Sequence, residues 1–119
     1  MWTISHDHAD GNRLKRYSRK HPREVASCFT NLAFLAEQLN GGITLQQAQS
    51  FGFFSTEGGN VFRIAQTAVR AAKETRLYIY AVAVRSVLYT LTIGDKDSQQ
   101  ADLRRCREIA ASIDRDGQP

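Results

Sequence analysis

Six positively charged side chains crowd one short stretch near the N-terminus, where they could bind phosphate. The whole chain carries a net charge of +4 at pH 7. Residues 13–23 include no acidic side chain, and their cations are Arg13, Lys15, Arg16, Arg19, Lys20 and Arg23. The rest of the chain holds ten positive and twelve negative residues, so the excess is local. A local excess attracts phosphate better than a diffuse one. The alternative is a solvated helix face without a ligand.

A second set of candidate side chains lies on one strand-like run. Alternate residues of a strand face opposite sides of its sheet. Arg76, Tyr78 and Tyr80 therefore share one face, and they point away from Leu77 and Ile79. Arginine offers fixed, paired donors that match phosphate oxygens, so this face is a candidate phosphate clamp.

Three runs rich in β-branched and aromatic residues must position these side chains. They cover residues 60–66, 75–82 and 86–93, with short polar breaks between them. Such runs predict consecutive antiparallel strands. A further short strand is expected at residues 2–5, at an edge of the sheet or beside a later strand.

Two helices are predicted before these strands. The first covers residues 9–20, and Pro22 fits the first turn of the second. Apolar residues then recur at steps of three and four across residues 25–39, as on a helix. Gly41 and Gly42 are expected to end this helix with a left-handed cap. The two helices would form an antiparallel hairpin.

Two further helices and an aromatic cluster complete the chain. Residues 43–50 are expected to form a short helix. The last helix would begin at a capping box of Asp97 and Gln100 and run to about Asp114. The aromatic cluster of Phe51, Phe53 and Phe54 is predicted to plug a loop onto the core, and the alternative is a surface for a partner or a base.

These elements predict a single α+β domain over residues 1–115. An N-terminal strand and a helical hairpin would pack on a small antiparallel sheet, followed by a C-terminal helix. Residues 116–119 are predicted to be a disordered tail. The sequence has no apolar run near the roughly 20 residues that a membrane span needs, and no signal-peptide core. We therefore expect a cytoplasmic protein without a membrane partner.

Other reactive side chains predict little chemistry. Cys28 and Cys106 fall among apolar residues of predicted helices, so buried free thiols are expected. His6 and His8 have metal-ligand spacing, but no third ligand is suggested nearby. We therefore predict neither a metal nor another cofactor.

Three local segments carry a resemblance to a known family. They are Phe62-Arg63-Ile64, the run Thr75-Arg76-Leu77-Tyr78-Ile79-Tyr80, and Ile93-Gly94-Asp95-Lys96. These segments resemble the RelE/ParE/HigB toxin superfamily of bacterial toxin–antitoxin pairs. Their order and the layout of the chain are also similar to that superfamily, whose RNA-cleaving members have an arginine like Arg76 in the active cleft. The resemblance implies a small basic toxin domain that a cognate antitoxin protein silences. It implies messenger RNA cleavage on the ribosome for the RelE and HigB branches, and action on DNA gyrase for the ParE branch.

RNA cleavage by a 2′-hydroxyl needs a base, an acid and a group that stabilises the charge of the phosphorane. Arg76, Arg63 and Lys96 could supply the stabilising charge. The alternative for Arg76 is an ion pair with Glu74 or Glu57.

The proton-transfer groups that the resemblance implies are missing. The position two residues beyond Arg63 is Ala65, where a second basic residue is common. The family's catalytic tyrosine or histidine near the last helix has no counterpart, since neither type occurs after Tyr89. Tyr78 is then a candidate among the remaining tyrosines, although an ordinary tyrosine is a poor base at pH 7.

Three functions stay open at this point. The first is a metal-free endoribonuclease that acts on ribosome-bound messenger RNA, favoured by the basic stretch and Arg76. The second is a catalytically silent ParE-like protein that binds gyrase, or an inactive relic, favoured by the missing acid and base. The third is an unrelated nucleic-acid-binding domain, in which Arg13, Arg16 and Arg19 matter and Arg76 does not.

Overall fold

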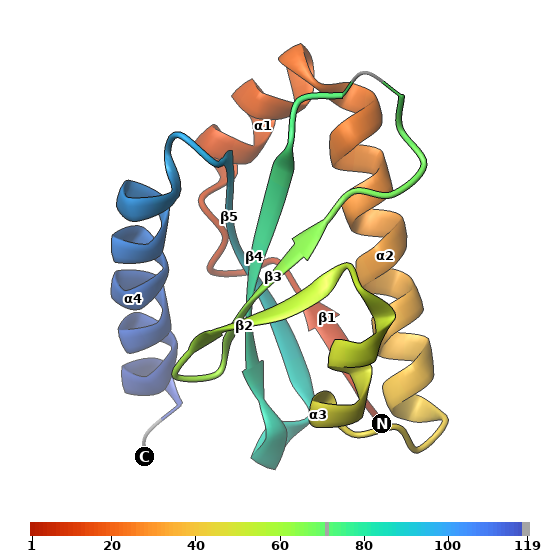
Figure 1. Cartoon of the computed structure of the whole chain (residues 1–119). Coiled ribbons are helices and arrows are strands. Elements are labelled where there is room, and N and C mark those ends of the chain that lie inside the picture. The colour runs from red at the N-terminus through yellow and green to blue at the C-terminus, as the bar shows by residue number, and fades with distance from the viewer. Residues whose placement is uncertain (71, 118–119) are drawn as a thin grey trace.

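A five-stranded sheet, in the order β1-β5-β4-β3-β2, lies at the centre of the protein (Figure 1). The computed structural model describes residues 1–70 and 72–117. Its strands are β1 (Thr3–Ser5), β2 (Phe54–Gly58), β3 (Val61–Ala65), β4 (Thr75–Val82) and β5 (Val87–Asp95). Its helices are α1 (Gly11–Lys20), α2 (Pro22–Asn40), α3 (Leu45–Ala48) and α4 (Gln99–Asp116), with single 3-10 turns η1 (Gln49–Phe51) and η2 (Ala83–Arg85). This architecture confirms the predicted α+β fold.

The strands pair in two ways. β1 runs parallel to β5, with Thr3 opposite Val87. The other neighbours, β5 with β4, β4 with β3 and β3 with β2, are antiparallel. The three predicted strands and the predicted N-terminal edge strand are therefore confirmed.

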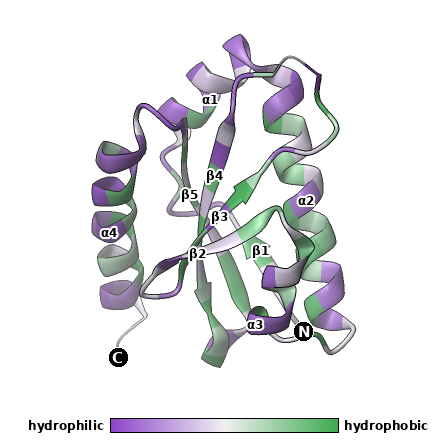
Figure 2. Cartoon of the chain, viewed as in Figure 1, coloured by the Kyte–Doolittle hydropathy of each residue, from purple (hydrophilic) through white to green (hydrophobic). Residues whose placement is uncertain are grey.

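Both faces of the sheet are buried, because helices cover each of them. Leu77 and Ile79 on one face pack in a core with Leu32 and Leu35 of α2. The opposite face presents tyrosines, and it packs against α4; the residues of this second core include Tyr78, Tyr80, Cys106, Ile109 and Ile113. The hydrophobic side of α4 faces the sheet and its hydrophilic side faces away (Figure 2). The alternation predicted for β4 is confirmed, and α4 conceals its arginine–tyrosine face.

The start of α1 and the junction between α1 and α2 fix the N-terminal helices on the sheet. Asp10 accepts a hydrogen bond from the backbone N–H of Arg13 and caps α1, so the helix begins two residues later than expected. α2 starts at Pro22 directly after α1 and runs back along the same side of the sheet (Figure 1). The predicted helical hairpin packed on the sheet is confirmed.

One strand was not predicted. β2 begins at Phe54, whose buried ring stacks on Phe62 at a centroid distance of 4.6 Å. The rest of β2 is polar and therefore does not look like a strand in the sequence. A turn with positive φ at Gly58, Gly59 and Asn60 reverses the chain into β3. The predicted aromatic plug is thus partly a strand and partly a loop.

The start of α4 differs from the prediction. The capping box of Asp97 and Gln100 is absent, because the N-cap residue is Ser98 and its side chain makes no capping hydrogen bond. Instead, Oδ1 of Asp95 accepts hydrogen bonds from the backbone N–H groups of Asp97 and Ser98, at 2.9 and 3.1 Å. α4 continues to Asp116, so the first residue of the predicted tail at 116–119 is helical instead. Residues 118–119 lie outside the described residues.

Smaller expectations have mixed outcomes. α2 ends at its glycines as expected, but Gly41 has helical φ and only Gly42 has the positive φ of a left-handed residue. The short helix after α2 is confirmed as α3 and η1. Cys28 and Cys106 are buried free thiols, as predicted. Within the described residues, no helix has the length and apolar character to cross a bilayer.

Candidate functional site

The exposed side of α1 and the first turn of α2 form a basic surface. It consists of five exposed residues, which are Lys15, Arg16, Arg19, Lys20 and Arg23. None of these five forms an ion pair with a described residue. Five unpaired cations side by side repel one another, so a bound polyanion would relieve an electrostatic cost that the free protein bears.

Arg13, the sixth cation of the predicted stretch, points inward. Its Nε donates to the carbonyl oxygen of Ile93 at 3.0 Å, and its Nη2 donates to Oγ of Ser98 at 3.3 Å. Its guanidinium also lies 4.0 Å from the carboxylate of Asp102. Arg13 therefore joins α1 to the end of β5 and the start of α4, and it belongs to the framework of the basic surface.

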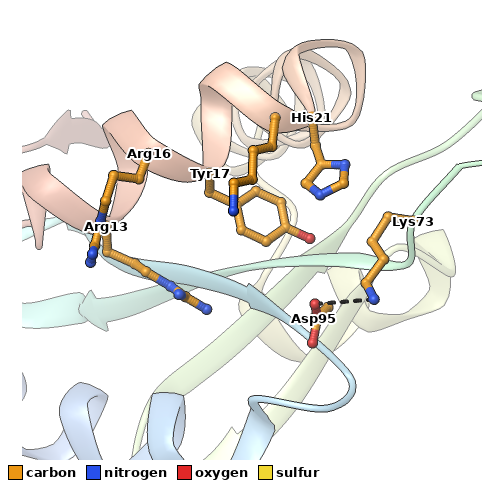
Figure 3. A pocket seen from close by; sticks show the side chains of 7 residues that line it. Arg13, Arg16, Tyr17, His21, Lys73 and Asp95 are labelled. Carbon is orange, nitrogen blue, oxygen red and sulfur yellow. Dashed lines mark ion pairs between the residues drawn. The ribbon is translucent and has the colours of Figure 1, made fainter.

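A cavity of about 310 Å³ opens beside this surface (Figure 3). Three parts of the chain contribute its walls: α1 with the junction to α2, the connection between β3 and β4, and the end of β5. The lining residues are Arg13, Arg16, Tyr17, Lys20, His21, Lys73 and Asp95. They carry four formal positive charges and one negative charge when histidine is neutral, so the cavity is electropositive.

Hydrogen bonds fix the floor of this cavity. The Tyr17 hydroxyl and the Thr75 hydroxyl lie 2.9 Å apart in a buried contact. Thr75 donates its own hydroxyl proton to the carbonyl oxygen of Lys73 at 3.1 Å, so Tyr17 is the donor in the first bond. Burial raises the pKa of Tyr17, while its hydrogen bond to Thr75 acts in the opposite direction. Tyr17 therefore stays protonated and holds the backbone that carries Lys73.

Two ion pairs of Lys73 and a contact between His21 and Glu24 lie at the rim. Nζ of Lys73 lies 3.5 Å from Asp95 and 3.8 Å from Asp97, and the His21 ring lies 3.4 Å from Glu24. Burial acts to raise the pKa of Asp95. The hydrogen bonds that its carboxylate accepts from backbone N–H groups, together with the charge of Lys73, outweigh burial and lower this pKa. Asp95 is therefore a carboxylate at neutral pH, and it offsets one of the four positive charges.

Three of the predicted catalytic residues, Arg63, Arg76 and Tyr78, form a separate cluster on the opposite face of the sheet. Arg76 is 7% exposed; its guanidinium donates to Oε1 of Gln99 and, at 3.1 Å, to Glu74. Arg63 lies 3.8 Å from Glu57, whose carboxylate also accepts from Gln99 at 3.4 Å. The ion pair of Arg76 with Glu74, expected as an alternative, is present. Gln99 of α4 thus contacts Arg76 directly and reaches Arg63 through Glu57.

The structure brings three of the four predicted catalytic residues together. Arg63 lies directly opposite Tyr78 in the pairing of β3 with β4, and Arg76 is on the same face of β4. Lys96 is exposed in the turn between β5 and α4, and among the described residues no hydrogen bond or ion pair joins it to either arginine. Lys96 is therefore not part of the cluster.

Tyr78 is poorly suited to accept a proton. Burial and the charge of Asp102 raise the pKa of Tyr78 to about 12, although Arg76 acts in the opposite direction. Burial acts to lower the pKa of Arg76, but Glu74 outweighs burial and raises it, so the guanidinium stays charged. The Tyr78 hydroxyl and Nε of Arg76 are buried, and neither makes a hydrogen bond with a described residue. The Arg76 guanidinium therefore stays charged, and Tyr78 is not a base at neutral pH.

Sequence reasoning missed Lys73 and Gln99. Lys73 precedes a strand in a connection without periodicity, and Gln99 lies in what resembles an ordinary helix start. Their roles come from contacts with residues far along the chain, so no local signal could have identified them. Within residues 1–70 and 72–117, no group of three or more His, Cys, Asp or Glu side chains is placed to hold a metal ion.

Comparison with known proteins adds no assignment. No protein-family model matches this chain, and neither a curated protein nor a solved structure matches it. The chain therefore has two candidate sites: an electropositive cavity beside the basic surface of α1, and a partly buried cluster of Arg63, Arg76 and Tyr78 on the sheet face that α4 covers.

Proposed function

We propose that this chain is an RNA-binding, RelE-like toxin component of a type II toxin–antitoxin pair, acting in the cytoplasm. The basic surface would bind the phosphates of structured RNA, with ribosomal RNA or messenger RNA as the target. A cognate antitoxin protein would silence it. The observation that carries this proposal is the group of five exposed cations without a described acidic partner.

The arrangement of these cations supports a polyanion as the ligand. α1 is about 15 Å long at 1.5 Å per residue, and its exposed cations continue into α2. A surface of this length can contact several consecutive phosphates, and such contacts contribute most of the affinity of nonspecific nucleic-acid binding. The rigid anchoring of Arg13 holds the helix in place, so little ordering is required when RNA binds.

A salt-dependent binding measurement tests this proposal. The test variant replaces Arg16, Arg19 and Lys20 with glutamine, and the control replaces three exposed α4 residues, Arg104, Arg107 and Arg115, with glutamine. Fluorescence anisotropy with a labelled RNA hairpin would be recorded over a series of salt concentrations. We expect the test variant to lose affinity and its log–log salt slope to fall by about 2 to 3, since each phosphate contact contributes roughly 0.7–0.9.

The control variant makes the result specific. It removes the same number of positive charges from exposed positions on α4, outside the basic surface, so it should bind the hairpin nearly as the wild type does. Equal losses in both variants would show that net charge alone drives binding, and unchanged affinity in the test variant would remove α1 from the interface. Either outcome contradicts the proposal.

A second candidate function is cleavage of messenger RNA by the buried cluster. The observation that favours it is the placement of Arg63, Tyr78 and Arg76 on one face, with two buried polar atoms unpartnered among the described residues. Such atoms are uncommon in folded proteins and are often explained by a ligand or by catalysis. The high pKa of Tyr78 and the cover provided by α4 speak against cleavage without rearrangement.

Induced expression distinguishes these functions. Wild type, Arg76→Ala and Arg76→Lys would be expressed while growth is followed and messenger RNA ends are mapped, with thermal unfolding as a check on folding. New ends within coding regions that vanish in both folded variants would establish the ribonuclease. Growth arrest with intact messages would identify a protein target such as gyrase, and normal growth would remove the toxin assignment while leaving RNA binding to be measured directly.

A further inference from the structure

We infer that the cavity beside α1 binds one phosphate monoester, such as the 5′-terminal phosphate of an RNA strand or of a nucleotide. This inference deepens the proposed function, because it assigns a ligand class to the cavity that adjoins the RNA-binding surface. The cavity differs from that surface in shape: its donors surround a space, whereas the exposed side of α1 meets a ligand from one direction.

Convergence of cations from separate elements is the first argument. Arg16 and Lys20 line the cavity from α1, His21 from the junction with α2, and Lys73 from the connection between β3 and β4. A monoester has three terminal oxygens and up to two negative charges, so it benefits from donors on several sides. An internal phosphodiester has fewer free oxygens and one charge, and the flat basic surface is enough for it.

Charge and size give the second argument. The lining carries four formal positive charges and one negative charge, an excess that favours an anion; Arg13 and Lys73 also have carboxylate partners outside the lining, in Asp102 and Asp97. The volume of about 310 Å³ exceeds the needs of a bare phosphate, and it lies at the lower end of the range for small-ligand pockets. The terminal nucleotide of a strand, with its phosphate innermost, fits this size.

Preorganisation of Lys73 is the third argument. The hydrogen bonds from Tyr17 to Thr75 and from Thr75 to the Lys73 carbonyl fix the backbone at the rim. The ammonium group is shared between Asp95 and the exposed Asp97, whose side chain is 88% accessible. Asp97 can turn into solvent when an anion arrives, while Asp95 keeps Lys73 over the cavity.

The test compares ligands that differ only in the phosphate. Wild type, Lys73→Gln and Asp97→Asn would be titrated with one short RNA carrying either a 5′-phosphate or a 5′-hydroxyl group. We expect the wild type to bind the phosphorylated strand about tenfold more tightly, as one charged hydrogen-bonded contact provides. Lys73→Gln should abolish the difference without changing the affinity for the 5′-hydroxyl strand. Asp97→Asn should enlarge it, because Lys73 loses a competing partner, and damage to the fold would not produce that gain.

A second arm separates this inference from the proposed function. Inorganic phosphate and a 5′-mononucleotide would be titrated into the labelled protein while NMR shifts are followed at Arg16, His21 and Lys73. Saturable shifts that Lys73→Gln removes support the site even if RNA does not bind, and they would identify a free nucleotide or phosphate as the ligand. RNA binding that ignores the 5′-phosphate, together with no saturable shift, overturns the cavity assignment and leaves the basic surface standing.

Discussion

Gln99, in the first turn of α4, accepts a hydrogen bond from the guanidinium of Arg76 on β4. The same side chain donates to Glu57 of β2, so one amide links two strands to the last helix. This link closes the sheet face on which the arginine–tyrosine cluster lies. The same contact therefore helps to hold α4 on the sheet and keeps the cluster covered.

Replacing Gln99 with alanine should destabilise the protein by about 1–3 kcal/mol, because a buried charged donor loses its acceptor. The neighbouring Gln100 is exposed and makes no such contact, so Gln100→Ala should change the free energy of unfolding little. Chemical denaturation of both variants measures the difference. Equal effects of the two substitutions would mean that the hydrogen bond to Arg76 contributes nothing.

Gly94 has no space for a side chain. It lies opposite Arg76 in the sheet, and an added Cβ would collide with the Asp102 carboxylate and the Ser98 hydroxyl. Gly94→Ala should cost about 1–3 kcal/mol of stability through overpacking at the start of α4. Gly11→Ala is the control, since nothing lies within 4 Å of that position; it should stabilise α1 by about 0.5–1 kcal/mol. Thermal melts should therefore shift in opposite directions.

Asp95 and Asp102 should give opposite pH dependences of stability. The folded pKa of Asp95 is lowered, so its contribution is present above its unfolded pKa of 3.8 and is lost as the pH falls through the folded value. Burial raises the folded pKa of Asp102, so its contribution is present below 3.8 and is lost as the pH rises through the folded value. Asp95→Asn should thus be more harmful at pH 7 than at pH 2, and Asp102→Asn should become less harmful as the pH rises. Urea denaturation from pH 2 to pH 7 measures how the destabilisation caused by each substitution depends on pH. If both dependences had the same sign, the assignment would be contradicted.

The hydroxyl groups of two neighbouring tyrosines should behave differently when removed. Tyr80 donates to the carboxylate of Asp114, at 2.9 and 3.0 Å to its two oxygens, so Tyr80→Phe should cost about 0.5–1.5 kcal/mol. The buried hydroxyl of Tyr78 interacts with the Arg76 guanidinium but makes no well-formed hydrogen bond with a described residue, so Tyr78→Phe should cost less than Tyr80→Phe. Denaturation measures both. A large loss in Tyr78→Phe would reveal a partner for this hydroxyl, and loss of toxicity without loss of stability would give Tyr78 a role in the second candidate function.

Local periodicity explains what the sequence could predict. The stripe of α2 and the alternation of β4 are properties of consecutive residues, so both were visible before the structure. β2 was not, because Ser55, Thr56 and Glu57 are polar and become a strand only through pairing with β3. Tertiary pairing of this kind routinely overrides local preference.

The candidate sites were predictable to a lesser extent. The composition of residues 13–23 showed the basic stretch. Which of its cations point outward, and that Arg13 points inward, depends on which side of α1 faces β5. Arg13 and Tyr17 are four residues apart and share a face, so helical spacing held a signal that the charge count concealed. Lys73 lines the cavity only because the sheet places the start of β4 next to α1. The sequence of residues 66–74 contains no signal that predicts this contact.

The parallel pairing of β1 with β5 determines when the basic surface can become fixed. Thr3 pairs with Val87, and the backbone N–H of Asp10 donates to the carbonyl oxygen of Leu91 at 2.7 Å, so both ends of the segment before α1 rest on β5. Contacts so distant in sequence form only after their loop entropy has been overcome. During synthesis the ribosome makes α1 before β2, β3, β4 and β5. The surface that we assign to RNA is therefore synthesised well before the strand that holds it in place.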